Sequence, residues 1–267
     1  MINFQRGKSV IEGEQSMLRK LSRDKHTQPY RGPISITRIQ PGDLLEDASG
    51  DFAFGPLSII DHAAMKKGIT IKMHEHVNDE ILSYVWKGTM YHKDSTGLEV
   101  PVSPGNLMLM NAGSSFWHEE KVKHDYVEML QIFVRPKEAK LEPLIQFHEK
   151  TDSNREWYMM VGPEGSKAPL HVRQNVYILD AHPKQGDRLE IPGYRGFQPF
   201  LYVMDGEIHV EGQSFKKLEA LTDLEKPIPP ITAVTDSTIV LFLVDMNAPM
   251  SMEGTISGRK GKKEQTK

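Results

Sequence analysis

Three histidines and one glutamate are spaced so that their side chains could hold one metal ion. His74 and His76 are separated by one residue, and so are His118 and Glu120. Residues i and i+2 of a strand point to the same face, so each pair would project together if both segments are strands. Three imidazole nitrogens and a carboxylate oxygen suit a divalent Fe, Mn, Ni, Cu, Zn or Co ion. The spacing therefore predicts one transition-metal site.

A second glutamate, Glu80, follows His76 by four residues and would share its register if the strand stays regular that far. Only Glu120 lies two residues from a candidate histidine ligand, so we expect Glu120 to be the carboxylate ligand. Glu80 is then expected to orient a ligand histidine or to accept a proton during catalysis. A solvated Glu80 without a role is the alternative.

The composition excludes several other kinds of chemistry. Cysteine is absent from the 267 residues, which rules out disulfides, thiolate catalysis and any metal site with cysteine ligands. The formal net charge of −3 gives no electrostatic footprint for nucleic acid or for an acidic membrane. Any metal must therefore be held by histidine nitrogens and carboxylate oxygens.

The elements that would position these side chains are short strands. Short apolar or alternating runs are separated by Gly, Pro, Asn and Asp, which is typical of a β-sandwich or barrel. We expect an all-β protein with short helices, one of them within residues 13–23. The runs that predict strands include residues 34–39, 57–60, 69–73, 81–86, 89–92, 107–110, 126–134, 157–161, 175–179, 199–204, 207–210 and 238–244.

A short internal repeat suggests two similar β-domains in tandem. The segment that runs from Tyr84 through Gly88 resembles the segment that runs from Tyr202 through Gly206, 118 residues later. In each copy an apolar strand meets a glycine turn, and a second strand leaves it. This pattern predicts a β-hairpin in each domain.

The chain is expected to divide into four parts. These are a polar N-terminal segment (1–33), a β-domain with the metal site (34–140), a second β-domain (141–250) and a basic, disordered tail (251–267). The first 20 residues have no apolar core of the kind found in secretory signals, so a cytoplasmic location is the default. The apolar run 239–244 has only six residues and predicts a buried strand, because a membrane-spanning helix needs roughly 20.

Two segments around the candidate ligands carry a resemblance to a known family. The pattern Gly68-x5-His74-x-His76-x3-Glu80-x7-Gly88 looks like the first motif of the cupin superfamily. More narrowly, residues 74–97 and 103–120 resemble the pirin family, including the turn His-Lys-Asp-Ser-Thr-Gly at 92–97. The similarity extends more weakly over residues 34–246.

This resemblance implies a bicupin with two tandem jelly-roll β-barrels and one metal ion in the N-terminal barrel. The ligands of the family fall on His74, His76, His118 and Glu120, and the metal is usually described as iron. Family members include quercetin 2,3-dioxygenases, transcriptional co-regulators and redox sensors. We therefore expect a dioxygenase that uses O2 and a flavonol or another small aromatic hydroxyl substrate, as a monomer or weak dimer.

Two alternatives stay open at this point. One is a metal-dependent redox sensor or co-regulator that binds a protein partner without turnover. The other is a metal-dependent isomerase or sugar-binding cupin, which has the same ligand types but lacks the pirin-like turns.

The resemblance also has departures that bear on the substrate and on the second domain. Phe116 and Trp117 add aromatic bulk beside His118 and are expected at the rim of the pocket. A shift of 118 residues places Pro192, Tyr194 and Gln198 at the positions of His74, His76 and Glu80. The second barrel is therefore expected to lack a metal site.

Overall fold

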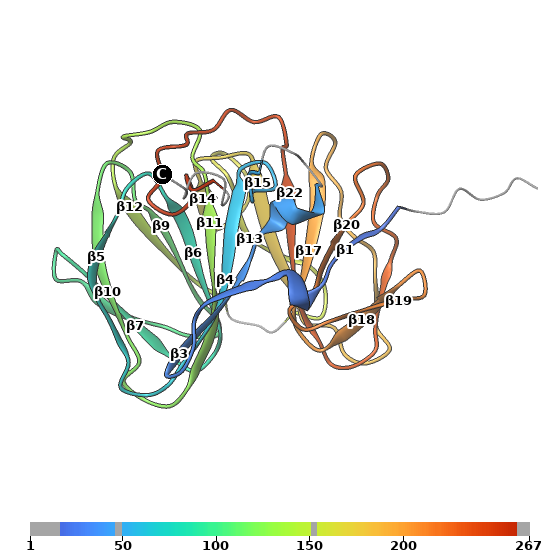
Figure 1. Ribbon diagram of the computed structural model, residues 1–267, viewed down its shortest axis with the longest axis horizontal. Coiled ribbons are helices and arrows are strands. Elements are labelled where there is room, and N and C mark those ends of the chain that lie inside the picture. Colours follow the sequence, from blue (N-terminus) through green and yellow to red (C-terminus); the bar gives the residue numbers. More distant parts are fainter. Residues whose placement is uncertain (1–16, 46–49, 151–153, 261–267) are drawn as a thin grey trace, which may run out of the picture.

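The computed structural model of the chain describes residues 17–45, 50–150 and 154–260, which form two β-barrels side by side (Figure 1). Within these residues each barrel combines a seven-stranded sheet with a four-stranded sheet, and the helices are limited to two 3-10 turns, η1 (Arg23–Lys25) and η2 (Pro41–Leu44). The all-β bicupin predicted from the sequence is confirmed. No helix in the described ranges is long and apolar enough to span a membrane.

The N-terminal barrel contains a larger sheet with the strand order β12-β9-β6-β11-β4-β3-β2 and a smaller sheet with the order β5-β10-β7-β8. The larger sheet consists of β2 (Thr27–Tyr30), β3 (Ile34–Ile39), β4 (Leu57–Met65), β6 (Glu80–Lys87), β9 (Asn106–Asn111), β11 (Val127–Val134) and β12 (Leu144–Glu149). The smaller sheet consists of β5 (Thr70–His76), β7 (Met90–Asp94), β8 (Glu99–Val102) and β10 (Phe116–Lys121).

The C-terminal barrel repeats this arrangement with the orders β1-β20-β17-β22-β15-β13-β14 and β16-β21-β18-β19. The larger sheet consists of β1 (Arg19–Leu21), β13 (Tyr158–Pro163), β14 (Leu170–Val172), β15 (Val176–Ala181), β17 (Gln198–Asp205), β20 (Ala220–Thr222) and β22 (Thr238–Val244). The smaller sheet consists of β16 (Arg188–Leu189), β18 (Glu207–Val210), β19 (Gln213–Lys216) and β21 (Ile231–Ala233).

The two larger sheets face each other at the centre of the molecule, so their middle strands are buried on both faces (Figure 1). Strand β22 shows the consequence. Val240 and Phe242 belong to the core shared by the two barrels, whereas Ile239 and Leu241 belong to the core inside the C-terminal barrel. A strand buried on both faces has a continuous apolar run instead of an alternating one, which explains residues 239–244.

The glycine turns of the internal repeat differ from the predicted hairpins. Gly88 and Gly206 both have positive φ, at 81° and 85°, and a Cβ at Gly88 would lie 2.1 Å from the backbone oxygen of Tyr126. However, the strands on either side of each glycine belong to different sheets. The chain therefore turns a corner from the larger to the smaller sheet at Gly88 and Gly206, and side chains are excluded there by sterics.

Two hydrogen bonds join equivalent positions across the interface between the barrels. Tyr84 Oη donates to Asp180 Oδ2 at 3.0 Å, and Tyr202 Oη lies 2.7 Å from His62 Nδ1. The tyrosines are 118 residues apart, and so are His62 and Asp180. The same two positions of each barrel therefore form the hydrogen bonds to the other barrel, as in an isologous two-fold interface.

A carboxylate beside this interface is held strongly in its charged form. Burial alone would raise the pKa of Glu128, but hydrogen bonds from His62 and Lys217 overcome this effect and lower it to about 2. Such a group stabilises the fold above its ordinary pKa of 4.5, and that contribution is lost as the pH falls from 4.5 toward 2.

The substitution Glu128→Gln is therefore expected to lower the melting temperature at pH 7 and to have little effect near pH 2. Circular dichroism melts over this pH range provide the measurement. Glu99→Gln is the matched control, because Glu99 pairs with Lys123 at the exposed surface and such pairs contribute little. An equal loss for Glu128→Gln at both pH values would contradict the expectation.

Strand pairing crosses the predicted domain limits at both ends of the first domain. Strand β1 lies within the predicted polar segment 1–33, yet it pairs with β20 of the C-terminal barrel. It also replaces the helix expected within residues 13–23, of which 13–16 lie outside the described residues. Strand β12 lies beyond residue 140 but pairs with β9 of the N-terminal barrel. Sequence composition does not reveal such exchanges, because they depend on long-range pairing.

Residues 251–260 are part of the fold, which corrects the prediction of a disordered tail for this part of 251–267. Ser257 is fully buried, and the segment crosses from β22 to the N-terminal barrel (Figure 1). Residues 261–267 lie outside the described part of the chain.

Candidate metal centre

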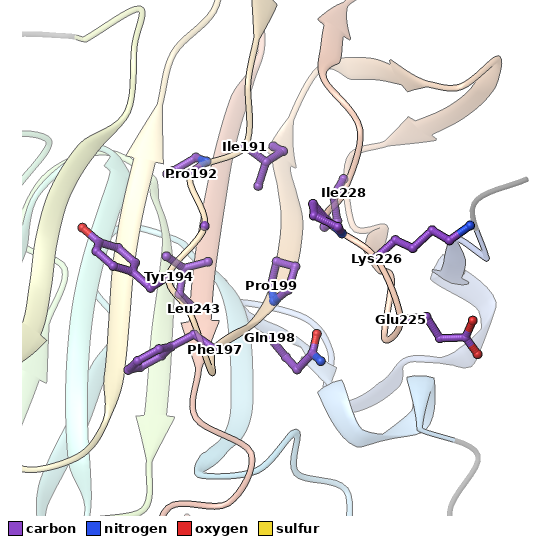
Figure 2. A pocket seen from close by; sticks show the side chains of 12 residues that line it. Ile191, Pro192, Tyr194, Phe197, Gln198, Pro199, Glu225, Lys226, Ile228 and Leu243 are labelled. Carbon is purple, nitrogen blue, oxygen red and sulfur yellow. The ribbon is translucent and has the colours of Figure 1, made fainter. Parts of the chain in front are cut away.

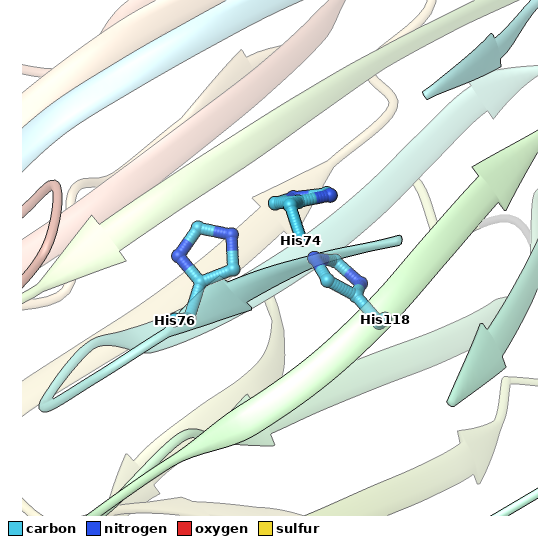
Figure 3. A group of neighbouring side chains, drawn as sticks. All are labelled: His74, His76 and His118. Atoms are coloured by element: carbon cyan, nitrogen blue, oxygen red, sulfur yellow. The ribbon is translucent and has the colours of Figure 1, made fainter. Parts of the chain in front are cut away.

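Three histidine rings gather inside the N-terminal barrel, as the spacing predicts (Figure 3). One nitrogen each from His74, His76 and His118 lies within 4.8 Å of the others. The ring centroids are 4.4 Å apart for His74 and His118, and 5.1 Å apart for His76 and His118. This is the one group of three or more potential ligands that satisfies this distance within the described residues.

The register of two strands explains why the rings converge. His74 and His76 share one face of β5, and β5 pairs with β10 so that His118 lies directly opposite His74. Cross-strand neighbours on one face have Cβ atoms about 5 Å apart, which brings imidazole rings into contact. Alternation on β5 and antiparallel pairing with β10 are therefore sufficient to build the cluster.

The Nδ1 atom of each ring faces a neighbouring group, which leaves Nε2 as the potential ligand atom. His74 Nδ1 lies 2.9 Å from the backbone oxygen of Lys72, and His76 Nδ1 lies 2.9 Å from Asp79 Oδ2. Metal-binding histidines typically donate their second ring N–H to a carbonyl or carboxylate in this way. The sequence reasoning did not identify Asp79, whose only signal was its position three residues after His76.

The third ring has a buried nitrogen without a partner. His118 Nδ1 lies 3.3 Å from His92 Nδ1, and His118 Nε2 is buried with no hydrogen-bond partner among the described residues. Burial, with the nearby His74, His76 and His92, lowers the pKa of His118 to about 2, so its ring is neutral at pH 7. A neutral, unpaired imidazole nitrogen beside two others fits a divalent metal ion.

Glu120 lies on the same face of β10 as His118 and is almost fully buried. Burial raises the pKa of Glu120 to about 7, although His76 and a hydrogen bond from Gln131 act in the opposite direction. Gln131 Nε2 donates to Glu120 Oε1 at 2.6 Å. Glu120 is not in the three-histidine group, so its role as fourth ligand stays a prediction.

Comparisons with known proteins agree with this geometry. Residues 23–134 match the family described as Pirin, and residues 159–244 match the family described as Quercetinase C-terminal cupin domain. The two matches together cover most of the chain. The chain belongs to the pirin family.

Relatives of this pirin include a quercetin 2,3-dioxygenase of Escherichia coli K12, which is 24% identical over 193 residues, or 71% of this chain and 82% of the relative. A pirin-like protein of Caulobacter vibrioides is 24% identical over 172 residues, or 63% of this chain and 74% of the relative. Among solved structures, the bacterial pirin YhhW of Escherichia coli in complex with nickel(II) matches with a TM-score of 0.75 and 20% identity. That match covers 85% of this chain and 99% of YhhW.

Glu80 occupies a different place in this pirin from the one that its spacing suggested. The chain turns at Asn78, which has a φ of 52°, and Glu80 begins the next strand, β6. Its carboxylate accepts hydrogen bonds from Asn111 and from the backbone N–H and side chain of Arg173 in the C-terminal barrel. The broken strand thus removes the shared register with His76 and turns Glu80 toward the barrel interface.

The two aromatic residues beside His118 also separate. Phe116 packs against the apolar cluster of Ile59, Ile81, Met110 and Phe133, and its ring centroid lies 6.2 Å from that of His92. Trp117 points to the opposite face of β10 and is 43% exposed. Phe116 therefore stays a candidate for contact with a substrate, whereas strand alternation directs Trp117 away from the histidines.

The second barrel has a pocket whose lining includes the residues at the positions equivalent to the candidate ligands (Figure 2). Pro192, Tyr194 and Gln198, the positions equivalent to His74, His76 and Glu80, line a cavity of about 330 Å³. Its other lining residues are mostly apolar, such as Phe197, Pro227 and Leu243, but they also include the charged Glu225 and Lys226. The expectation that the second barrel lacks a metal site stays a prediction.

Proposed function

We propose that this pirin is a mononuclear, metal-dependent dioxygenase that acts on a flavonol or another small aromatic hydroxyl compound. The observation that carries the proposal is the buried, unpartnered Nε2 of His118 beside the rings of His74 and His76. The name of the quercetin 2,3-dioxygenase relative supports the reaction class. The ligand types favour iron in our proposal, and Ni, Mn, Cu, Zn or Co would also fit.

The ligand set would be Nε2 of His74, His76 and His118 with a carboxylate oxygen of Glu120. When bound, the divalent ion supplies a positive charge that lowers the pKa of a substrate hydroxyl and redox chemistry toward O2. Gln131 holds one oxygen of the Glu120 side chain at 2.6 Å and thereby limits its rotation.

Glu120 also has the properties of a proton acceptor. Without metal, burial raises the pKa of Glu120 to about 7, and a bound divalent ion would lower it, so the carboxylate would be charged and able to accept a proton. We propose that Glu120 accepts the proton of the substrate hydroxyl. The ring of Phe133 lies 6.1 Å from that of His76, and Phe116 packs beside it, so a flat aromatic substrate would find an apolar surface next to the ligands.

The test is oxygen uptake with quercetin by protein loaded with Fe(II), Ni(II) or Mn(II). Glu120→Gln is expected to lower kcat/KM by about 100-fold or more, because a proton acceptor typically contributes a factor of 10² to 10⁴. Glu119→Gln is the matched control, since Glu119 points to the other face of the same strand. Loss of activity in both variants, or in neither, would contradict the role of Glu120.

A second candidate function is a metal-dependent sensor that binds a protein partner without turnover. The direct contact of His76 with Asp79, which in turn binds the C-terminal segment, is the observation that favours it. Metal binding without oxygen uptake across a panel of flavonols and catechols would favour this function over the oxygenase.

A further inference from the structure

The C-terminal segment Thr255–Ser257 lies against the turn that connects β5 to β6, directly beside the metal centre. The backbone N–H of Thr255 donates to the backbone oxygen of Val77, the residue after His76, at 2.9 Å, and the Thr255 hydroxyl accepts a bond from the Val77 N–H at 2.8 Å. Ser257 and Asp79 are both fully buried. The segment comes from a position 178 residues later in the chain, so the contact is tertiary.

Asp79 joins this segment to His76. Its Oδ1 accepts hydrogen bonds from the backbone N–H of Ser257 at 2.9 Å and from the Ser257 hydroxyl at 2.7 Å. Its Oδ2 accepts from the backbone N–H of Ile256 at 3.1 Å and faces His76 Nδ1 at 2.9 Å. The carboxylate that orients the ligand ring is therefore itself held by the C-terminal segment.

The opposite side of the segment is anchored to the N-terminal barrel. The backbone oxygen of Ser257 accepts hydrogen bonds from Ser58 Oγ at 2.7 Å and from Arg135 Nε at 2.8 Å. Arg135 is almost fully buried and forms a bidentate ion pair with Asp51. Arg135 therefore holds the Ser257 backbone through a buried and fixed guanidinium, and this anchor is kept when the Ser58 hydroxyl is removed.

Tight packing leaves no room for other side chains at the ends of the segment. A Cβ at Gly254 would lie 2.6 Å from Asp79 Oδ1, and a Cβ at Gly258 would lie 2.3 Å from the backbone oxygen of Met252. Ile256 packs against the apolar cluster that includes Phe116 and Phe133, next to the His76 ring. Both the polar and the apolar surroundings of His76 thus include the C-terminal segment.

We infer that the segment Thr255–Ser257 belongs to the metal centre. Ser257 fixes the carboxylate of Asp79, and Asp79 positions the ring of His76 for the metal. The inference rests on the proposed metal site. Ser257 and Asp79 are positioning residues, because they act on the metal through His76. Ile256 adds an apolar contact on the side where we expect the substrate.

The experiment compares Ser257→Ala with Ser58→Ala in full-length protein. Each variant removes one hydroxyl that bonds to the same short segment, but only Ser257 reaches Asp79. Co(II) affinity, measured by competition with a chelator, is expected to fall about 10-fold for Ser257→Ala and 10- to 100-fold for Asp79→Asn. Ser58→Ala is expected to stay within twofold of the wild type.

A second measurement does not depend on metal. In metal-free protein, the Cε1–H NMR signal of the His76 ring is expected to shift in Ser257→Ala and to stay unchanged in Ser58→Ala. Unchanged His76 signals together with unchanged Co(II) affinity in Ser257→Ala and Asp79→Asn would overturn the inference, whatever their melting temperatures. If Ser257→Ala shifts the His76 signal but the wild-type protein binds no divalent metal, the positioning role is supported and the proposed metal function is refuted.

Discussion

The substitution His118→Leu is expected to abolish metal binding while leaving the metal-free protein folded. The wild type is expected to carry about one transition-metal ion per chain, and the loss of affinity should exceed the roughly 100-fold effect of removing a group that only orients a ligand. His118 Nε2 is buried without a hydrogen-bond partner in the described residues. Such a group lowers the stability of the metal-free fold by about 1–3 kcal/mol. The metal-free variant should therefore melt no lower than metal-free wild type.

Elemental analysis and melting curves with and without added metal provide the measurement. Metal should raise the melting temperature of the wild type but not of His118→Leu, because only a species that binds the native state stabilises it. His124→Ala is the control, since His124 is exposed on the loop that follows β10 and contacts Tyr91. Full retention of metal in His118→Leu would refute the ligand assignment.

The three-histidine cluster could be predicted partly from a local rule, strand alternation, and partly from the family resemblance, which implied that the two strands lie together. Alternation places His74 and His76 on one face, and the pairing of two adjacent strands brings His118 opposite His74. The buried strand at 239–244 was predictable for a similar reason, since a run of six apolar residues is too short for a membrane helix and suits a strand covered on both sides.

The environment of these ligands was not predictable, because it depends on residues distant in the sequence. The segment around Ser257 is rich in glycine and polar residues, which is the composition of a disordered tail. Its order comes from hydrogen bonds to Asp79 and Arg135, far earlier in the chain. Glu80 would share the register of His76 only on a strand that continues through both residues, and the turn at Asn78 ends that strand, as the turn residues Asn78 and Asp79 indicate.

The two barrels share their packing across the interface but differ at the positions of the histidine cluster. The equivalent tyrosines, Tyr84 and Tyr202, both reach across the interface, so the packing function is present in both copies. The ligand positions differ: the positions of His74 and His76 carry Pro192 and Tyr194 in the second copy. Tyr194 stacks on Tyr177 with ring centroids 4.7 Å apart, so this position takes part in packing in the second copy.

The inter-barrel ion pair between Glu80 and Arg173 is expected to contribute strongly to the stability of the fold. Glu80 is 1% exposed, and burial raises its pKa while Arg173 opposes this shift. Arg173→Ala would leave a buried carboxylate without its cation, and such losses cost about 3–5 kcal/mol. Urea denaturation at pH 8 is the measurement.

The pH dependence of this loss follows from the sign of the pKa shift. Without Arg173 the pKa of Glu80 in the folded state rises further above its value in the unfolded state. The folded state is therefore destabilised as the pH rises from the unfolded pKa toward the folded pKa. The loss in Arg173→Ala is therefore expected to be larger at pH 8 than at pH 5. Lys184→Ala is the control: its pair with Asp236 is exposed, and the loss should be at most about 1 kcal/mol at both pH values.

A double variant separates the structural role of Glu80 from a catalytic one. Glu80→Gln combined with Arg173→Met removes both charges, and such replacements of a buried pair by neutral groups are often close to neutral for stability. If Glu80 serves only to join the barrels, this variant should recover most of the lost stability and keep the metal affinity and oxygen uptake of the wild type. A stable, metal-loaded double variant without turnover would instead return Glu80 to the chemistry, as the proton acceptor that its spacing first suggested.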